Sequence, residues 1–138
     1  MRVTIPTESD LGAFAAEFAK RLRPGDVVAL SGPLGSGKTA FVRAVVRALH
    51  GADQTSSPSF TFRHRYGGDP PIEHIDLFRI EDPREVAELG LDEALDGRSI
   101  AFIEWWTKAP EAIPPPRYEV EIEGAGDEPR TLILRPPR

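Results

Sequence analysis

Gly32-Pro33-Leu34-Gly35-Ser36-Gly37-Lys38-Thr39 matches the pattern G-x-x-x-x-G-K-[ST], and this stretch decides the fold. An apolar run, Val27-Val28-Ala29-Leu30, precedes it, and a helix-like segment follows at residues 40–49. Glycines let the backbone curl so that successive N–H groups point inward, and the following helix adds positive potential beneath them. The strand, loop and helix together predict a phosphate-binding loop (P-loop) rather than a chance glycine-rich turn.

The groups of this loop have predicted roles in binding a nucleoside polyphosphate. Lys38 would reach the β- and γ-phosphates, and the Thr39 hydroxyl would bind Mg²⁺. The predicted nucleotide-binding residues are Pro33, Leu34, Gly35, Ser36, Gly37, Lys38, Thr39 and Ala40.

Length and composition indicate a single domain covering residues 1–138. The 138 residues are 40% apolar and 28% charged, which is ordinary for a globular chain with one hydrophobic core. The absence of cysteine excludes a disulfide scaffold and thiolate metal sites. No apolar run is long enough to cross a bilayer, and the first residues lack a signal-peptide core. We therefore expect a cytoplasmic protein without a membrane partner.

The net charge of −5 is unevenly distributed. Residues 1–50 hold seven Lys and Arg against four Asp and Glu (+3), whereas residues 69–138 hold eight against seventeen (−9). Because phosphate neutralisation supplies most non-specific affinity, an acidic chain is a poor candidate for gripping nucleic acid by itself. The acidic half fits either a basic protein partner or ordinary solvated surface.

Periodicity predicts the remaining elements. In chain order they are an edge strand at 3–5, a helix capped by Thr7 or Ser9 with Lys20, Arg21 and Arg23 in its last turn, a strand at 27–30, a helix at 38–50, a hairpin of strands 60–66 and 72–77, one or two short helices from Asp82 to Leu95, a buried strand at 99–103, an irregular segment at 105–116, and a hairpin of strands 118–123 and 131–135. The predicted fold is an α/β, three-layer P-loop NTPase-like domain. Its mixed β-sheet has parallel strands around the loop and antiparallel hairpins at the flank.

Hydrolysis would also need groups that hold Mg²⁺ and position water. Glu104 ends a buried strand at the sheet edge where α/β proteins bind ligands, so we expect it to reach Mg²⁺. Asp76 shares a strand face with His74 and would orient or deprotonate water. His74 fits an ordinary half-buried histidine equally well. The hydroxyls of Ser57-Pro58-Ser59-Phe60 occupy the place of a γ-phosphate-sensing loop, although spacing alone favours a plain turn.

Other candidates are not distinguished by the sequence. Arg63, Arg65 and Arg79 are possible charge stabilisers, but no pattern separates them from surface arginines. Trp105 and Trp106, beside Glu104, are more typical of packing than of base stacking.

Four motifs in this order resemble the bacterial TsaE family (also called YjeE), the P-loop ATPases of tRNA threonylcarbamoyladenosine biosynthesis. They are the P-loop, Ser57-Pro58-Ser59-Phe60, His74-Ile75-Asp76-Leu77-Phe78-Arg79 and Ile103-Glu104-Trp105. The first is generic to P-loop proteins, and the other three are specific. Ser59 replaces a threonine of the family pattern, Phe78 replaces a tyrosine, and Pro33 stands where an acidic or small polar residue is common.

The resemblance implies a set of residue roles and partners. Thr39 and Glu104 would hold Mg²⁺, and Ser59 and Asp76 would serve the γ-phosphate and hydrolysis, so the implied catalytic residues are Asp76, Glu104 and Ser59. The nucleotides would be ATP and ADP. The resemblance also implies a weak ATPase that acts with the TsaB–TsaD complex and resets it for further turnovers, with tRNA reached only indirectly.

Two alternatives belong to other functional classes. A P-loop small-molecule kinase usually carries a lid and an acceptor pocket, for which this chain has little length. A GTP-dependent switch would read guanine through N-K-x-D, but the chain contains no asparagine and no D-x-x-G.

Overall fold

The structure, a computed structural model, describes residues 1–50 and 63–137. Its elements in chain order are β1 (Arg2–Ile5), α1 (Glu8–Ala19), β2 (Val27–Ser31), α2 (Lys38–His50), β3 (Arg63–Tyr66), β4 (Ile72–Asp76), η1 (Pro83–Ala87), α3 (Leu91–Ala94), β5 (Ile100–Glu104), η2 (Trp106–Lys108), η3 (Pro110–Ala112), β6 (Tyr118–Glu123) and β7 (Arg130–Arg135).

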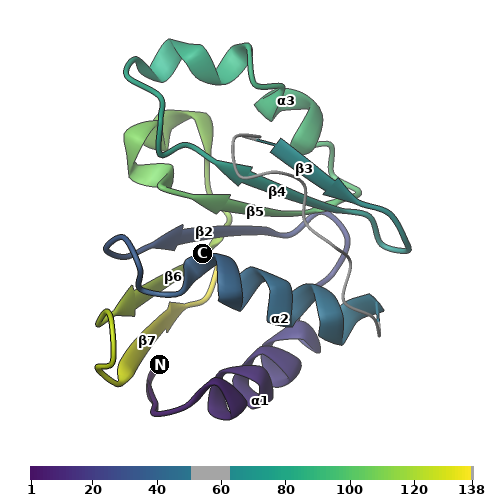
Figure 1. Ribbon diagram of the computed structural model, residues 1–138. Helices are drawn as coiled ribbons and strands as arrows, with labels where there is room; N and C mark the ends of the chain where they lie inside the picture. Colours follow the sequence, from purple (N-terminus) through teal and green to yellow (C-terminus); the bar gives the residue numbers. More distant parts are fainter. Residues whose placement is uncertain (51–62, 138) are drawn as a thin grey trace.

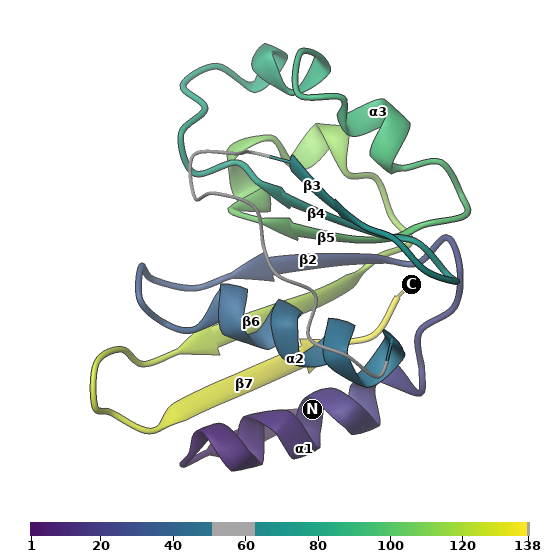
Figure 2. The same cartoon turned by 45° about the vertical axis from the view of Figure 1, so that its right-hand side comes forward.

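The seven strands of the described residues form one mixed sheet in the order β1-β7-β6-β2-β5-β4-β3 (Figures 1 and 2). The central strands β6, β2, β5 and β4 run parallel. The antiparallel hairpins β3–β4 and β6–β7 lie at the two flanks, and β1 pairs with β7 at the outer edge. The predicted mixed sheet with flanking hairpins is confirmed.

Helices cover both faces of this sheet (Figure 1). On one face, α1 and α2 pack on the sheet through Phe18 and Phe41, whose ring centroids are 5.8 Å apart. The other face carries α3 and the short helical turns, with Leu91 and Ile113 packed on Ile75 and Ile103. Because both faces are covered, β2 and β5 are almost continuously apolar, as expected of buried parallel strands. The predicted three layers are confirmed.

Helix α1 begins as predicted and ends earlier than predicted. Thr7 is its N-cap, and the Thr7 and Asp10 side chains form a reciprocal capping box. The helix ends at Ala19, so the expectation that Lys20, Arg21 and Arg23 lie in its last turn is wrong. The amide of Arg21 donates to the Phe18 carbonyl, and this tighter i→i+3 bond ends the helix before Pro24.

The remaining predicted elements agree with the structure in the described residues. Residues 60–62 of the predicted strand 60–66 lie outside the described residues, and β3 begins at Arg63. The irregular segment 105–116 contains only the short turns η2 and η3. No helix among the described residues has the length and apolarity needed to cross a bilayer.

Candidate functional site

Three parallel strands end at one edge of the sheet and position a pocket there. The P-loop leaves β2 at this edge, and Asp76 and Glu104 are the last residues of β4 and β5, paired in register. Because the carboxyl ends of parallel strands meet at one edge, residues distant in the chain come together. The pocket has a volume of about 280 Å³ and is lined by Leu34, Gly35, Gly37, Lys38, Thr39, Ala40, Asp76, Phe78, Glu104 and Trp105.

Glycine is required at the turn into the P-loop. Gly32 has a φ of +148°, and a Cβ there would lie 2.4 Å from the Ile122 carbonyl oxygen. Gly35 and Gly37 also have positive φ angles, 80° and 103°. The main chain therefore curls as the motif predicts, and α2 begins directly at Lys38.

The Lys38 ammonium folds back on its own loop. Its Nζ donates to the Gly32 carbonyl at 2.7 Å and to the Pro33 carbonyl at 3.0 Å, and it lies 4.4 Å from the ring centroid of Trp105. Burial lowers the pKa of Lys38, against the opposing effect of the Glu104 and Asp76 carboxylates. Trp105 thus covers the ammonium and lines the pocket. From the sequence alone, a tryptophan beside Glu104 was more typical of packing.

The Glu104 carboxylate lies within hydrogen-bonding distance of two side chains, those of Thr39 and His74. Its Oε2 accepts a hydrogen bond from Thr39 Oγ1 at 3.0 Å and lies 2.5 Å from His74 Nε2. The Glu104 side chain is only 4% exposed, and that of His74 is 11% exposed. The structure therefore brings Thr39 and Glu104 together, and it places His74 in the site.

The oxygens of Thr39 and Glu104 fit Mg²⁺ as a partial ligand set. Magnesium in nucleotide sites is held by one or two protein oxygens, with phosphates and waters completing the octahedron. Within residues 1–50 and 63–137, no group of three or more His, Asp or Glu side chains is arranged to hold a metal ion. The two oxygens of Thr39 and Glu104 therefore suit an ion whose other ligands are phosphate oxygens and waters.

Asp76 lies beside Glu104 at the end of the neighbouring strand. Its Oδ1 accepts a hydrogen bond from the Phe78 amide at 2.9 Å, which fixes the carboxylate. Burial raises the pKa of Asp76, and the nearby Glu104 carboxylate adds to this, although the Phe78 amide, His74 and Lys38 act in the opposite direction. A fixed carboxylate with a raised pKa suits a proton acceptor near bound phosphate.

Phe78 and Trp105 form an aromatic wall at the mouth of the pocket. Their ring centroids are 5.0 Å apart, and Phe78 is 41% exposed. The Phe78 carbonyl accepts a hydrogen bond from Lys108. Aromatic character at both positions was visible in the sequence, but the pairing requires the fold.

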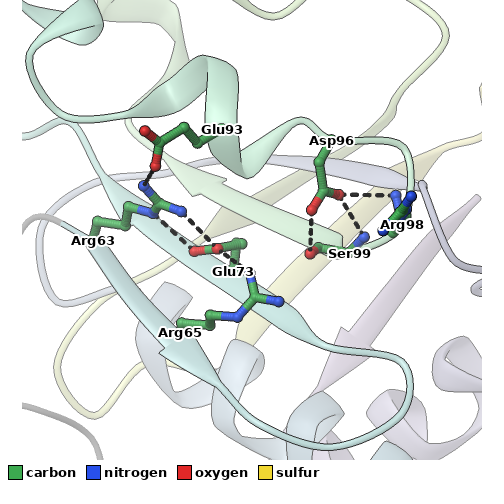
Figure 3. A network of polar contacts seen from close by, with 7 residues as sticks. All are labelled: Arg63, Arg65, Glu73, Glu93, Asp96, Arg98 and Ser99. Atoms are coloured by element: carbon green, nitrogen blue, oxygen red, sulfur yellow. Dashed lines mark hydrogen bonds and ion pairs between the residues drawn. The ribbon is translucent and has the colours of Figure 1, made fainter.

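Two arginines that the sequence left open point away from this pocket. Arg63 and Arg65 of β3 bind the buried Glu73 on the face of the sheet that carries α3 (Figure 3). His74 and Asp76 alternate with Glu73 along β4 and therefore project from the opposite face. Ser59 and the rest of Ser57-Pro58-Ser59-Phe60 lie outside the described residues.

A second pocket, missed by the sequence reasoning, borders the other side of the P-loop. It has a volume of about 240 Å³ and is lined by Ile5, Pro6, Thr7, Glu8, Leu11, Ser36, Gly37, Ala40, Gly126, Asp127, Glu128 and Arg130. The buried Ser36 hydroxyl in its wall has no hydrogen-bond partner among the described residues. No local motif marks this pocket, because it joins both ends of the chain.

Comparisons with known proteins identify a family model, related proteins and a crystal structure that this chain resembles. The family model described as "Threonylcarbamoyl adenosine biosynthesis protein TsaE" matches residues 5–132. A Bacillus subtilis (strain 168) protein named tRNA threonylcarbamoyladenosine biosynthesis protein TsaE is 37% identical over 135 residues, covering 96% of this chain and 82% of that protein. The Rickettsia typhi protein of the same name is 38% identical over 122 residues, covering 87% and 84%. The crystal structure of Bacillus subtilis YdiB matches with a TM-score of 0.79 at 30% identity, covering 97% of this chain and 83% of that one.

Proposed function

This chain belongs to the TsaE family, and from that premise we propose that it binds and hydrolyses ATP with Mg²⁺ in tRNA threonylcarbamoyladenosine biosynthesis. The observation that carries the proposal is the convergence of Lys38, Thr39, Asp76 and Glu104 on one pocket beneath the P-loop. Each of these side chains has the chemistry that one part of an ATPase site requires.

Binding would use the P-loop and the two oxygen ligands beside it. The Lys38 ammonium would exchange its bonds to the Gly32 and Pro33 carbonyls for bonds to the β- and γ-phosphates. Thr39 Oγ1 and the Glu104 carboxylate would hold Mg²⁺. A bound Mg²⁺ would neutralise the charge that develops on the phosphate oxygens.

Hydrolysis would depend on Asp76. Because Oδ1 is engaged by the Phe78 amide, Oδ2 is left to accept a hydrogen bond from the attacking water. The raised pKa of the carboxyl favours its acting as a proton acceptor near neutral pH. We propose that Ser59, on the chain between α2 and β3, also serves the γ-phosphate, as the family motif implies.

The second pocket offers space for the nucleoside of ATP or ADP. It shares Gly37 and Ala40 with the first pocket, so one nucleotide would span the P-loop. The polar side chains of Thr7 and Asp127, which line this pocket, would supply hydrogen-bond partners for a ribose or a base.

We further propose that the ATPase is weak alone and that the TsaB–TsaD complex stimulates it. Among the described residues that line the first pocket, Lys38 is the one cation, against Asp76 and Glu104. Phosphoryl transfer depends mainly on positioning and electrostatics, so a partner that adds a cation or orders the site would accelerate it. Hydrolysis would then reset the partner, and the net charge of −5 agrees with reaching tRNA only through proteins.

The test is a steady-state ATPase assay with and without purified TsaB–TsaD from the same organism, paired with tRNA modification over many turnovers. We expect slow hydrolysis alone, acceleration by the complex, and multi-turnover modification only when this chain is present. Partner-independent hydrolysis at the typical kinase rate of about 1–100 per second contradicts the proposal. Equal multi-turnover modification without this chain also contradicts it, and a phosphorylated metabolite would favour the kinase alternative.

A further inference from the structure

One arginine joins the P-loop to the far end of the chain. Arg130, the first residue of β7, is partly buried beside the apex of the loop. Its Nε donates to the Ser36 carbonyl at 2.8 Å, and its Nη2 donates to the Gly35 carbonyl at 3.2 Å. On its other side, Nη2 donates to the Gly126 carbonyl at 3.0 Å and Nη1 donates to the Glu128 carbonyl. The guanidinium therefore bridges the P-loop and the β6–β7 turn.

All hydrogen bonds that Arg130 makes within the described residues end on main-chain carbonyls. An arginine that serves as a charge partner is instead matched with a carboxylate or a phosphate. The planar guanidinium presents five donors in a fixed fork, and here the fork spans carbonyls of two separate segments. A lysine ammonium, which is a point donor, cannot span them in the same way.

The direction of these bonds affects the loop. In a trans peptide the C=O and N–H groups point in opposite directions. The bond from Arg130 draws the Ser36 carbonyl toward β7. The N–H of the same peptide, which belongs to Gly37, therefore points away from Arg130. Gly37 lines the first pocket. The Ser36 N–H is itself held by the Pro33 carbonyl at 3.0 Å. Two successive peptides at the loop apex are thus fixed.

We infer that Arg130 is a positioning residue of the P-loop, which holds the Gly35 and Ser36 carbonyls outward and so presets the loop for phosphate. This inference rests on the proposed nucleotide site. A glycine-rich loop has large conformational freedom, and ordering it at the moment of binding would lower affinity. Arg130 removes part of that cost by ordering the loop in the free protein.

The test measures polyphosphate affinity in Arg130→Met by calorimetry with inorganic tripolyphosphate and with ATP, both in the presence of Mg²⁺. Arg135→Met is the matched control. Arg135 lies on the same strand, is exposed and forms an ion pair with Glu121 at 3.5 Å within the described residues. We expect Arg130→Met to lower the affinity for both ligands by the same factor, about tenfold or more. Arg135→Met should change neither. Arg130→Lys should lose affinity for both ligands to a similar extent. If circular dichroism shows that Arg130→Met does not fold, Arg130→Lys replaces it as the test variant.

Unchanged tripolyphosphate affinity in either folded Arg130 variant overturns the inference. Loss of ATP affinity alone also overturns it, because that result would mean that Arg130 contacts the nucleoside rather than positioning the loop. Both outcomes leave the proposed function intact. A parent protein that binds neither ligand overturns the proposed function itself, and the inference falls with it.

Discussion

The Glu104 carboxylate connects His74 with Thr39, since one of its oxygens lies within hydrogen-bonding distance of both. From sequence alone, His74 fitted an ordinary half-buried histidine equally well. At 2.5 Å, His74 Nε2 and Glu104 Oε2 must share a hydrogen, because two lone pairs would repel each other. His74 therefore fixes the orientation of a proposed metal ligand, as outer partners of metal ligands generally do.

Substitution of His74 by Ala should weaken Mg²⁺ binding more than it weakens nucleotide binding. Loss of an outer partner typically costs 10- to 100-fold in metal affinity or activity, so the Mg²⁺ concentration for half-maximal effect should rise by about this factor. The measurement is a Mg²⁺ titration of tryptophan fluorescence at fixed ADP, because Trp105 lines the pocket. His50→Ala is the control, since His50 is the last residue of α2 and its Nε2 lies 2.9 Å from the Pro70 carbonyl oxygen. An unchanged Mg²⁺ midpoint in His74→Ala would show that the contact has no positioning role.

Asp76→Asn should abolish most ATPase activity and still stabilise the fold at neutral pH. Burial raises the pKa of Asp76, so ionisation of this carboxyl disfavours the folded state. The parent should lose stability as pH rises from about 4, the unfolded value, through the raised folded pKa. The asparagine keeps an acceptor for the Phe78 amide and avoids this loss, so we expect a higher melting temperature than that of the parent at pH 7.

Thermal melts of both proteins from pH 3 to pH 8 provide the check on Asp76→Asn. The difference in melting temperature should close below about pH 4, where the parent carboxyl is protonated in both states. A variant that is less stable than the parent at pH 7 would refute the assigned direction of the Asp76 pKa.

At the scale of elements, a buried carboxylate joins β3, β4 and α3. Glu73 has a side chain with 0% exposure and accepts hydrogen bonds from Arg63 and Arg65 of β3 (Figure 3). Arg63 also contacts Glu93 on α3, and a Cβ on Gly90 would lie 2.4 Å from its Nη1. Burial alone would raise the pKa of Glu73, but the bonds from Arg63 and Arg65 outweigh it and lower this pKa.

Arg63→Met should destabilise the protein by about 3 kcal/mol, because it leaves the buried Glu73 carboxylate with one cation instead of two. Arg84→Met is the control, since the Arg84–Asp82 pair is exposed and should contribute little. Urea unfolding measures both. The lowered pKa means that the stabilisation is fully present above the unfolded pKa of Glu73 and is lost as pH falls through the folded value. Equal unfolding midpoints for the two variants at pH 7 would contradict this role of Arg63.

At the scale of the whole molecule, the sequence predicted the elements whose signals are local. The P-loop motif, the apolar strands beside it and the alternating pattern at 118–123 each indicate their structure within a few residues. The end of α1 was predicted wrongly because the cationic residues that suit a helix end, Lys20, Arg21 and Arg23, all lie beyond Ala19.

Contacts across the sheet could not be predicted in this way. Arg130 contacts Ser36 across 94 residues, and the Lys38 ammonium lies over Trp105, which follows a different strand. No local pattern encodes such contacts, because they depend on the order in which β2, β5, β6 and β7 pair. The same holds for His74 and Glu104, whose approach follows from the parallel register of β4 and β5.

Calorimetric titration of the parent and of Lys38→Ala with ATP, ADP and GTP, in the presence of Mg²⁺, tests whether the P-loop pocket is an adenine-nucleotide site. We expect the parent to bind ATP and ADP in preference to GTP. We also expect Lys38→Ala, folded as judged by circular dichroism, to lose most of its ATP affinity, because the ammonium supplies the point charge at the phosphates. Unchanged ATP affinity in the folded variant, or a parent that binds no adenine nucleotide, would contradict the assignment of this pocket to ATP.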